Sequence, residues 1–249
     1  MKRLLWAGIL LAGAVMSTGA MAADLYVKSP SGPVPEWGWT EFYFGLNMGY
    51  ATGNASWCTR AEGTRCPGPD NYAQSTSGIV EGGQFGYRWQ VPNTIFVLGV
   101  EGMFNGLDIS GTAPGLLSPA TQTRYTQFNN LVSATGSLGL AMGRLLAYGK
   151  AGGAWTELNL DASDTVSGAD LSKYQWVTGW TAGAGLEYML FTHFSVGVEY
   201  NYYQFDPGNI TGLANNLGAV IPCAFCNFGR TDVQTITGRI NIKLWPWGP

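Results

Sequence analysis

Six charged residues share one face of the predicted strands and could form either a reactive cluster or an ion-paired one. Five of them lie in segments where large apolar residues alternate with small or polar residues, and these five occupy the second set of positions. The sixth, Lys150, lies in 145–155, where Gly and Ala dominate and alternation sets no clear register. The six residues are Arg88, Glu101, Lys150, Glu187, Glu199 and Arg239. Two neighbouring carboxyl groups could act as general acid and base, whereas carboxylates beside cations would neutralise one another.

The catalytic interpretation of these carboxylates lacks the other groups it requires. A nucleophile must be activated by a nearby base. No Ser or His accompanies the carboxylates at a suitable depth, and the single histidine, His193, falls in a short turn. The sequence therefore predicts a buried salt-bridge network inside the fold, and no enzyme.

Eight alternating segments are expected to hold these residues. In Trp39–Tyr50 the large side chains fall on every second position from Phe42 to Tyr50, with Tyr43, Gly45 and Asn47 between them. A period of two residues is typical of a β-strand with two unlike faces. The other seven predicted strands are 78–90, 94–104, 128–141, 145–155, 174–188, 194–205 and 231–244.

The connections between these strands are alternately short and long. Turns of a few residues follow the second, fourth and sixth strands, whereas long polar loops are predicted at 51–77, 105–127, 158–173 and 206–230. An even strand number with short turns at one rim and long loops at the other is typical of outer-membrane barrels. Each strand also reaches the roughly 9–11 residues that cross a bilayer at a tilt. The predicted fold is an all-β, eight-stranded antiparallel up-and-down transmembrane β-barrel.

Composition supports a membrane barrel over a soluble one. Charged residues make up 12% of the chain, against roughly 25% in ordinary soluble domains. A soluble eight-stranded barrel would place its large residues inside and its charges outside, but here the charges share a face with Gly, Ser and Thr. Aromatic residues near strand ends suggest interfacial girdles: Trp37, Trp39, Trp89, Tyr188, Trp245 and Trp247. The net charge of −3 is too small to indicate a nucleic-acid partner.

Segments outside the barrel are also predicted. Lys2 and Arg3 precede an apolar run, and Ala20-Met21-Ala22 has the small-x-small cleavage pattern, so residues 1–22 are interpreted as a secretory signal peptide. A Pro-rich periplasmic tether covers 23–38, the barrel 39–245, and a short C-terminal extension 246–249. No later apolar run reaches the roughly 18 residues of a spanning helix.

Four cysteines form two groups, Cys58 with Cys66 and Cys223 with Cys226. An even number in an exported chain indicates disulfides, with three connectivities available. Local Cys58–Cys66 and Cys223–Cys226 bonds are the first expectation. Bonds between the two loops stay open, because the first and last strands of a closed barrel are neighbours. The Cys223–Cys226 spacing is that of a redox motif, but no βαβ unit surrounds it, so redox chemistry is not expected. Zinc binding is not expected either, because no histidine lies on that rim. Neither a metal nor a cofactor is therefore predicted.

Several motifs, taken in order, resemble the small alphaproteobacterial outer-membrane barrel proteins of the porin-like surface-antigen group. The matching stretches are Trp39–Tyr50, Gly82–Gln90, Leu98–Gly102, Gly179–Tyr188 and Glu199–Tyr202, spread over nearly all of the predicted mature chain. The resemblance implies an abundant eight-stranded outer-membrane barrel with both termini in the periplasm. Members of this group are described as structural surface proteins, weak porins and, in some lineages, haemin binders.

Two positions depart from that family pattern. Thr135 and Ser137 stand where the family usually has two lumenal arginines, which makes the lumen less cationic. Leu244 stands where the chain usually ends on an aromatic residue read by the assembly machinery, and five residues follow it.

Three functions follow as hypotheses. The first is a structural surface protein with a largely plugged lumen, whose partners are outer-membrane lipid and the barrel-assembly machinery. The second is a weak porin, disfavoured because eight strands leave room only for side chains, but supported by six lumenal glycines: Gly45, Gly49, Gly86, Gly99, Gly183 and Gly185. The third is capture of a small molecule such as haem by extracellular loops through Trp57, Tyr72, Phe225 and Phe228.

Overall fold

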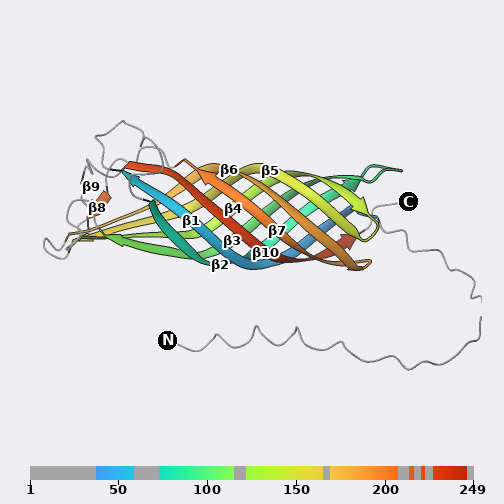
Figure 1. The fold of residues 1–249 in the computed structure, drawn as a ribbon, viewed down its shortest axis with the longest axis horizontal. Coiled ribbons are helices and arrows are strands. Elements are labelled where there is room, and N and C mark those ends of the chain that lie inside the picture. The colour runs from blue at the N-terminus through green and yellow to red at the C-terminus, as the bar shows by residue number, and fades with distance from the viewer. Residues whose placement is uncertain are drawn as a thin grey trace, which may run out of the picture. The chain divides into compact units, whose positions relative to one another are not determined.

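Eight long strands close into one antiparallel barrel in the computed structural model (Figure 1). They are β1 Glu41–Cys58, β2 Ala73–Gln90, β3 Phe96–Pro114, β4 Gln122–Met142, β5 Leu145–Asp164, β6 Ala169–Phe191, β7 Phe194–Phe205 and β10 Asn227–Trp245. Their order around the barrel is β5-β4-β3-β2-β1-β10-β7-β6, and pairing of β5 with β6 closes it. The predicted eight-stranded antiparallel barrel is confirmed. Two short strands, β8 Leu213–Asn215 and β9 Val220–Ile221, extend the sheet from β6.

The structure describes residues 38–58, 73–114, 122–164, 169–206, 213–215, 220–221 and 227–245. The predicted signal peptide, nearly all of the tether and the C-terminal extension lie outside these residues. Among the residues described, no helix has the length and apolar character to cross a membrane.

Tight turns connect the strands at one rim, here called the turn end. They cover residues 91–95, 143–144 and 192–193. Asn93 has a φ of 59° and Gly143 a φ of 62°, the left-handed conformation that Asn and Gly adopt at lowest cost. The opposite rim, where β1 and β2, β3 and β4, β5 and β6, and β7 and β10 are joined, is called the loop end.

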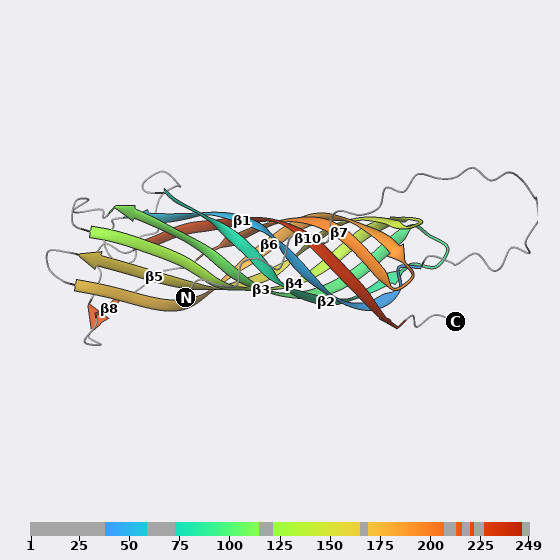
Figure 2. The same cartoon turned by 90° about the horizontal axis from the view of Figure 1, so that it is seen from below.

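The strands run further toward the loop end than the sequence predicted. β1 continues eight residues beyond Tyr50, β3 continues to Pro114, and β5 continues to Asp164. The predicted loops 51–77, 105–127 and 158–173 are therefore too long, because their outer parts are strand. A row of diagonal strands is visible from both directions (Figure 1, Figure 2).

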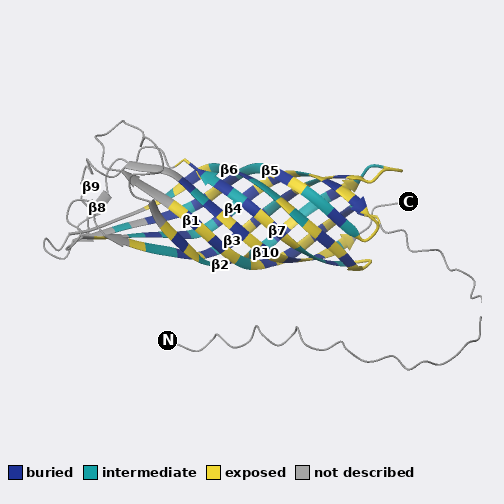
Figure 3. Ribbon diagram, in the orientation of Figure 1, coloured by how far each residue is buried: buried dark blue, intermediate teal, exposed yellow. Residues whose placement is uncertain are grey.

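The physical reason is a reversal of polarity along the strands. Near the turn end the outward positions are apolar and the inward ones polar: Leu46 is 68% exposed, whereas Asn47 is buried. Near the loop end Leu107 and Ile109 are buried inside the barrel, and Asp108 between them is exposed. The alternation of buried and exposed positions continues into this region (Figure 3). Large apolar residues no longer mark the outer face there on β1, β3 and β10, whereas β6 still carries exposed Tyr174 and Trp176.

We name these parts the turn-end section and the loop-end section. On β1 the change falls between Tyr50 and Thr52, and on β10 between Ile236 and Gln234, since these are consecutive outward positions. A bulge in β4 between Phe128 and Leu131 shifts the register, so both of these side chains face inward.

One expected girdle residue lies elsewhere. Trp39 was predicted to sit at the lipid interface, but it is fully buried, and its indole Nε1 donates a hydrogen bond to the carbonyl oxygen of Gly143 at 3.1 Å. It packs with Val97, Leu146 and Met189 in an apolar cluster at the turn end of the lumen. Trp89 and Tyr188 are exposed on the outer face.

Candidate functional site

The charged residues predicted from sequence meet inside the barrel, in the turn-end section. All six are buried, and they come from β2, β3, β5, β6, β7 and β10. Because inward positions on neighbouring antiparallel strands lie side by side, residues far apart in sequence converge on the narrow interior of an eight-stranded barrel. The structure joins them in two linked clusters.

The first cluster is a ring of two cations and two carboxylates. Lys150 Nζ contacts Glu101 Oε1 at 2.9 Å and Glu199 Oε1 at 2.7 Å. The guanidinium of Arg239 contacts the other oxygen of each carboxylate, Glu101 Oε2 and Glu199 Oε2. Every carboxylate oxygen in this ring therefore faces a cation.

The second cluster surrounds Arg88. Its guanidinium makes a bidentate pair with Glu187, with Nη1–Oε1 at 2.9 Å and Nη2–Oε2 at 2.7 Å. Arg88 Nη1 also lies 3.3 Å from Glu41 Oε1, and Lys243 Nζ lies 2.8 Å from Glu41 Oε2. Bidentate, charge-assisted pairs of this kind fix geometry more firmly than single contacts.

Two tyrosines connect the clusters. The Tyr43 hydroxyl donates to Glu101 Oε2 at 2.8 Å, and the Arg88 guanidinium carbon lies 4.2 Å from the centre of the Tyr43 ring. The Tyr148 hydroxyl donates to Glu199 Oε2 at 2.6 Å and accepts from Arg239 Nη1 at 2.9 Å, and the Arg88 guanidinium carbon lies 5.8 Å from the centre of the Tyr148 ring. Sequence reasoning had left Tyr43, Tyr148, Glu41 and Lys243 out of the network. Tyr43 could have been found from its position, because it shares the parity of Gly45 and Asn47.

The completed network is electrically balanced. Glu41, Glu101, Glu187 and Glu199 supply four negative charges, and Arg88, Lys150, Arg239 and Lys243 supply four positive charges. A carboxylate engaged by two cations is a poor general base, because its lone pairs are occupied and its negative charge is stabilised. The arrangement is suited to filling the lumen, not to acid–base chemistry.

Little room remains around these charges. The cavity beside Tyr43, Glu101, Tyr148 and Lys150 has a volume of about 10 Å³, which is roughly the space of one water molecule.

The lumenal glycines contribute to this filling. A Cβ atom at Gly86 would meet the hydroxyl of Tyr43, and one at Gly185 would meet the hydroxyl of Tyr148. At Gly183 it would meet the side-chain oxygen of Asn201. Neighbouring side chains thus lie flat over these glycines. Glycine was taken from sequence as a sign of an open lumen, but here it makes the space that a tyrosine or asparagine occupies.

Amide side chains fill the lumen beside the charged residues, and on β10 Asn241 lies between Arg239 and Lys243. Asn47 Nδ2 donates to Gln84 Oε1 at 2.8 Å, and Gln84 Nε2 donates to Asn241 Oδ1 at 2.8 Å. Beyond these amides lies an apolar cluster inside the loop-end section, which includes Phe128, Leu158, Tyr203 and Phe205. The lumen is therefore occupied by an apolar cluster at the turn end, a polar region of charges and amides, and a second apolar cluster toward the loop end.

Other sequence predictions can only be placed in part. Cys66, Cys223, Cys226, Tyr72 and Phe225 lie outside the described residues, as do the side chains of Cys58, Trp57 and Phe228. The backbones of Trp57 and Phe228 pair across β1 and β10. Thr135, at the first departure from the family pattern, is buried, and its hydroxyl lies 3.5 Å from the carbonyl oxygen of Glu101.

Over the described part of the chain, no three His, Cys, Asp or Glu residues are grouped to hold a metal ion.

Comparisons with known proteins agree with this architecture. Residues 8–221 match the model of the family described as the outer membrane protein beta-barrel domain. The chain is 33% identical over 234 residues to the 31 kDa outer-membrane immunogenic protein of Brucella melitensis biotype 1, and equally to the protein of that name from Brucella suis biovar 1. The alignments cover 87% of this chain and 92% of each relative.

Among solved structures, the outer membrane protease OmpT from Escherichia coli superposes with a TM-score of 0.52 at 9% identity, covering 82% of this chain and 97% of OmpT. OprG from Pseudomonas aeruginosa gives a TM-score of 0.45 at 15% identity, covering 84% of this chain and 99% of OprG. At 9% identity the likeness to OmpT concerns the fold alone.

Proposed function

Since this chain belongs to the outer membrane protein beta-barrel domain family and is an outer-membrane protein, we propose that it acts as a structural surface barrel with a sealed lumen. In this role the barrel anchors its loop-end connections at the outer surface and conducts no solute. The Brucella relatives are named as immunogenic outer-membrane proteins, which supports exposure of part of the chain at the cell surface.

The observation that carries this proposal is the balanced network across the lumen. Four carboxylates and four cations from seven strands close the turn-end section around a cavity of about 10 Å³. A water-filled pore would keep such charges hydrated and apart, whereas here they pair directly. Removing one partner of a buried pair costs about 3–5 kcal/mol, so opening the lumen by separating the pairs is energetically unfavourable.

The orientation follows from barrel construction. Outer-membrane barrels have short periplasmic turns and longer extracellular loops. The turn end of this barrel is therefore assigned to the periplasm and the loop end to the exterior. With eight strands, both chain termini then also fall on the periplasmic side. Outer-membrane lipid around the barrel and the barrel-assembly machinery are its proposed partners.

Single-channel recording in planar bilayers tests the proposal against a weak pore. The wild-type barrel should give no current steps, and Glu101→Gln should also stay near zero while its unfolding midpoint falls. Asp108→Asn is the matched control, because Asp108 is exposed on the outer face of β3 in the loop-end section. A measurable wild-type conductance whose cation preference decreases in Glu101→Gln would overturn the sealed lumen in favour of the pore.

A further inference from the structure

The outer wall of the barrel is hollowed over β4 to β7. A groove of about 810 Å³ lies there, within the roughly 300–1,000 Å³ range of ligand sites. Small residues from two strands, Ala147, Gly149 and Ala184, face it, and larger ones such as Leu138 and Leu186 border it. β1, on the other side of the barrel, presents large exposed residues at its outward positions instead: Phe42, Phe44, Leu46 and Met48.

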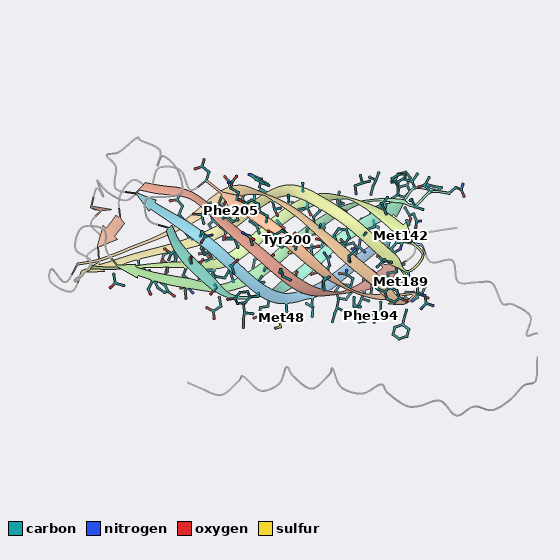
Figure 4. All side chains as sticks on the ribbon, viewed as in Figure 1. Met48, Met142, Met189, Phe194, Tyr200 and Phe205 are labelled. Carbon is teal, nitrogen blue, oxygen red and sulfur yellow. The ribbon has the colours of Figure 1, made fainter. Side chains whose placement is uncertain are left out.

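An aromatic–polar cluster adjoins this groove on its loop-end side. It consists of Trp180, Tyr200, Tyr202, Gln204, Asp232 and Gln234. Tyr200 also lines the groove, so the two features are continuous. Figure 4 places Tyr200 between Phe205 and the turn-end residues Met142 and Met189.

Hydrogen bonds order this cluster across β6, β7 and β10. Trp180 Nε1 donates to Gln204 Oε1 at 3.0 Å, Tyr202 donates through its hydroxyl to Asp232 Oδ1 at 2.7 Å, and Tyr200 to Gln234 Oε1 at 3.0 Å. The Trp180 and Tyr202 ring centres are 5.6 Å apart. Aromatic side chains with a polar atom at one edge are suited to the boundary between hydrocarbon and water.

The chemistry of the cluster favours one class of head group. Its six side chains include a carboxylate, two amides and exposed ring faces, but no cation. Phosphate recognition relies on arginine or lysine, and Asp232 would repel a phosphate. Sugar hydroxyls, which both donate and accept, match carboxylate and amide groups and can lie against an aromatic face.

We propose that the groove and the aromatic–polar cluster together bind an amphiphile with a saccharide head group. Its alkyl chain lies over Ala147, Gly149 and Ala184, and its sugar contacts Trp180, Asp232 and Gln234. With the loop end outward, as in the proposed function, the head group lies on the outer-surface side of the groove, and the alkyl chain extends from it toward Ala147 near the turn end. The site does not depend on whether the lumen conducts, so the two proposals fail independently.

Two probes with the same alkyl chain separate the sugar from a phosphate head group. The barrel is transferred into an oligo-oxyethylene detergent and titrated with dodecyl maltoside or dodecylphosphocholine, and bound molecules are counted by native mass spectrometry. One dodecyl maltoside should bind saturably, with dodecylphosphocholine roughly tenfold weaker, which corresponds to 1.4 kcal/mol, or about one or two net hydrogen bonds. Equal binding of both probes would overturn the assignment.

Variants test the two halves of the site separately. Gly149→Leu fills the floor and should weaken both probes, and a Cβ there has only the Gly183 carbonyl oxygen nearby, at 3.9 Å. Ala184→Leu should do the same, which keeps the test valid if one variant folds poorly. Gln234→Ala should weaken only dodecyl maltoside. Gly83→Leu, at an outward position of β2, is the control and should bind as wild type.

Undiminished binding of both probes by Gly149→Leu and Ala184→Leu would contradict the site. A barrel dimer that is cross-linked through β5 and excludes both probes would also contradict it, because the groove would then be an interface between two copies.

Discussion

The two sections of the barrel use the same strands with opposite polarity. In the turn-end section, Leu46 and Leu138 face outward and Glu101 and Glu199 face inward. In the loop-end section, outward positions carry residues such as Asp108, and inward positions carry Phe128 and Leu158. One part is built like a membrane barrel, and the other like a small soluble barrel.

Strand length explains why both solutions occur in one chain. About 9–11 residues cross a bilayer at a tilt, whereas β4 has 21 residues and β6 has 23. The surplus must project into water, where an apolar exterior is unfavourable and an apolar interior becomes the stabilising core. The environment outside the wall therefore decides which face of each strand carries the apolar residues.

The largest expected effect comes from breaking the charge network. Glu101→Gln removes a carboxylate shared by Lys150, Arg239 and Tyr43, and we expect it to lower the free energy of unfolding by about 3–5 kcal/mol. Urea unfolding in lipid vesicles, followed by the gel shift between unheated and boiled samples, measures this change. Asp108→Asn, on the outer face of the loop-end section, should change it by less than about 0.5 kcal/mol. An equal response of the two variants would mean that the lumenal charges are solvated.

Truncating a leucine in each section distinguishes the two kinds of core. Leu158→Ala in the loop-end section should cost about 2–5 kcal/mol, because Leu158 is almost fully buried and its loss leaves a cavity. Leu46→Ala should cost much less, because Leu46 is 68% exposed and lipid tails can fill the space left by its side chain. The same unfolding measurement applies. A larger loss of unfolding free energy at Leu46 than at Leu158 would contradict the assignment of the apolar core to the loop-end section.

A smaller effect is expected from the lumenal glycines. At Gly86 a Cβ would lie 2.6 Å from both the Tyr43 hydroxyl and the Val100 carbonyl oxygen, so Gly86→Ala should cost about 1–3 kcal/mol through overpacking. At outward Gly83 the nearest atom is 3.4 Å away, so Gly83→Ala serves as control. If Gly86→Ala were as stable as wild type, the lumen would have free space beside Tyr43.

Much of the barrel could be predicted because one rule applies to most of the chain. Alternation from Phe42 to Tyr50, and likewise along β7 and β10, identified strands and separated outward Val198 from inward Glu199. The strand number and the identity of the membrane-facing side followed from that pattern and from the short turns. The charged inward residues were identifiable for the same reason, since a charge on a strand's polar face stands out.

The strand ends at the loop end, the bulge in β4 and the position of Trp39 could not be predicted from alternation. Leu107 and Ile109 were assigned to a loop, because an apolar residue on the formerly polar face looks like the end of the pattern. Phe128 has the parity of outward Val132 and yet is buried, because a bulge changes parity without a clear sequence signal. Trp39 was expected at the interface, but its indole has a specific partner at Gly143, 104 residues away, and long-range contacts of that kind leave no periodicity.

An arginine scan of the outward positions of β1 tests the reversal most directly. Arginine is substituted in turn at Phe44, Leu46, Met48, Tyr50, Thr52 and Asn54, and the free energy of unfolding in lipid vesicles is measured for each variant. The cost should reach about 2–4 kcal/mol near the bilayer midplane and fall to about 0–1 kcal/mol near its edge, so that Thr52→Arg and Asn54→Arg resemble wild type. A cost at Thr52 and Asn54 as large as at Leu46 would show that the loop-end section is also in lipid, and would contradict the account.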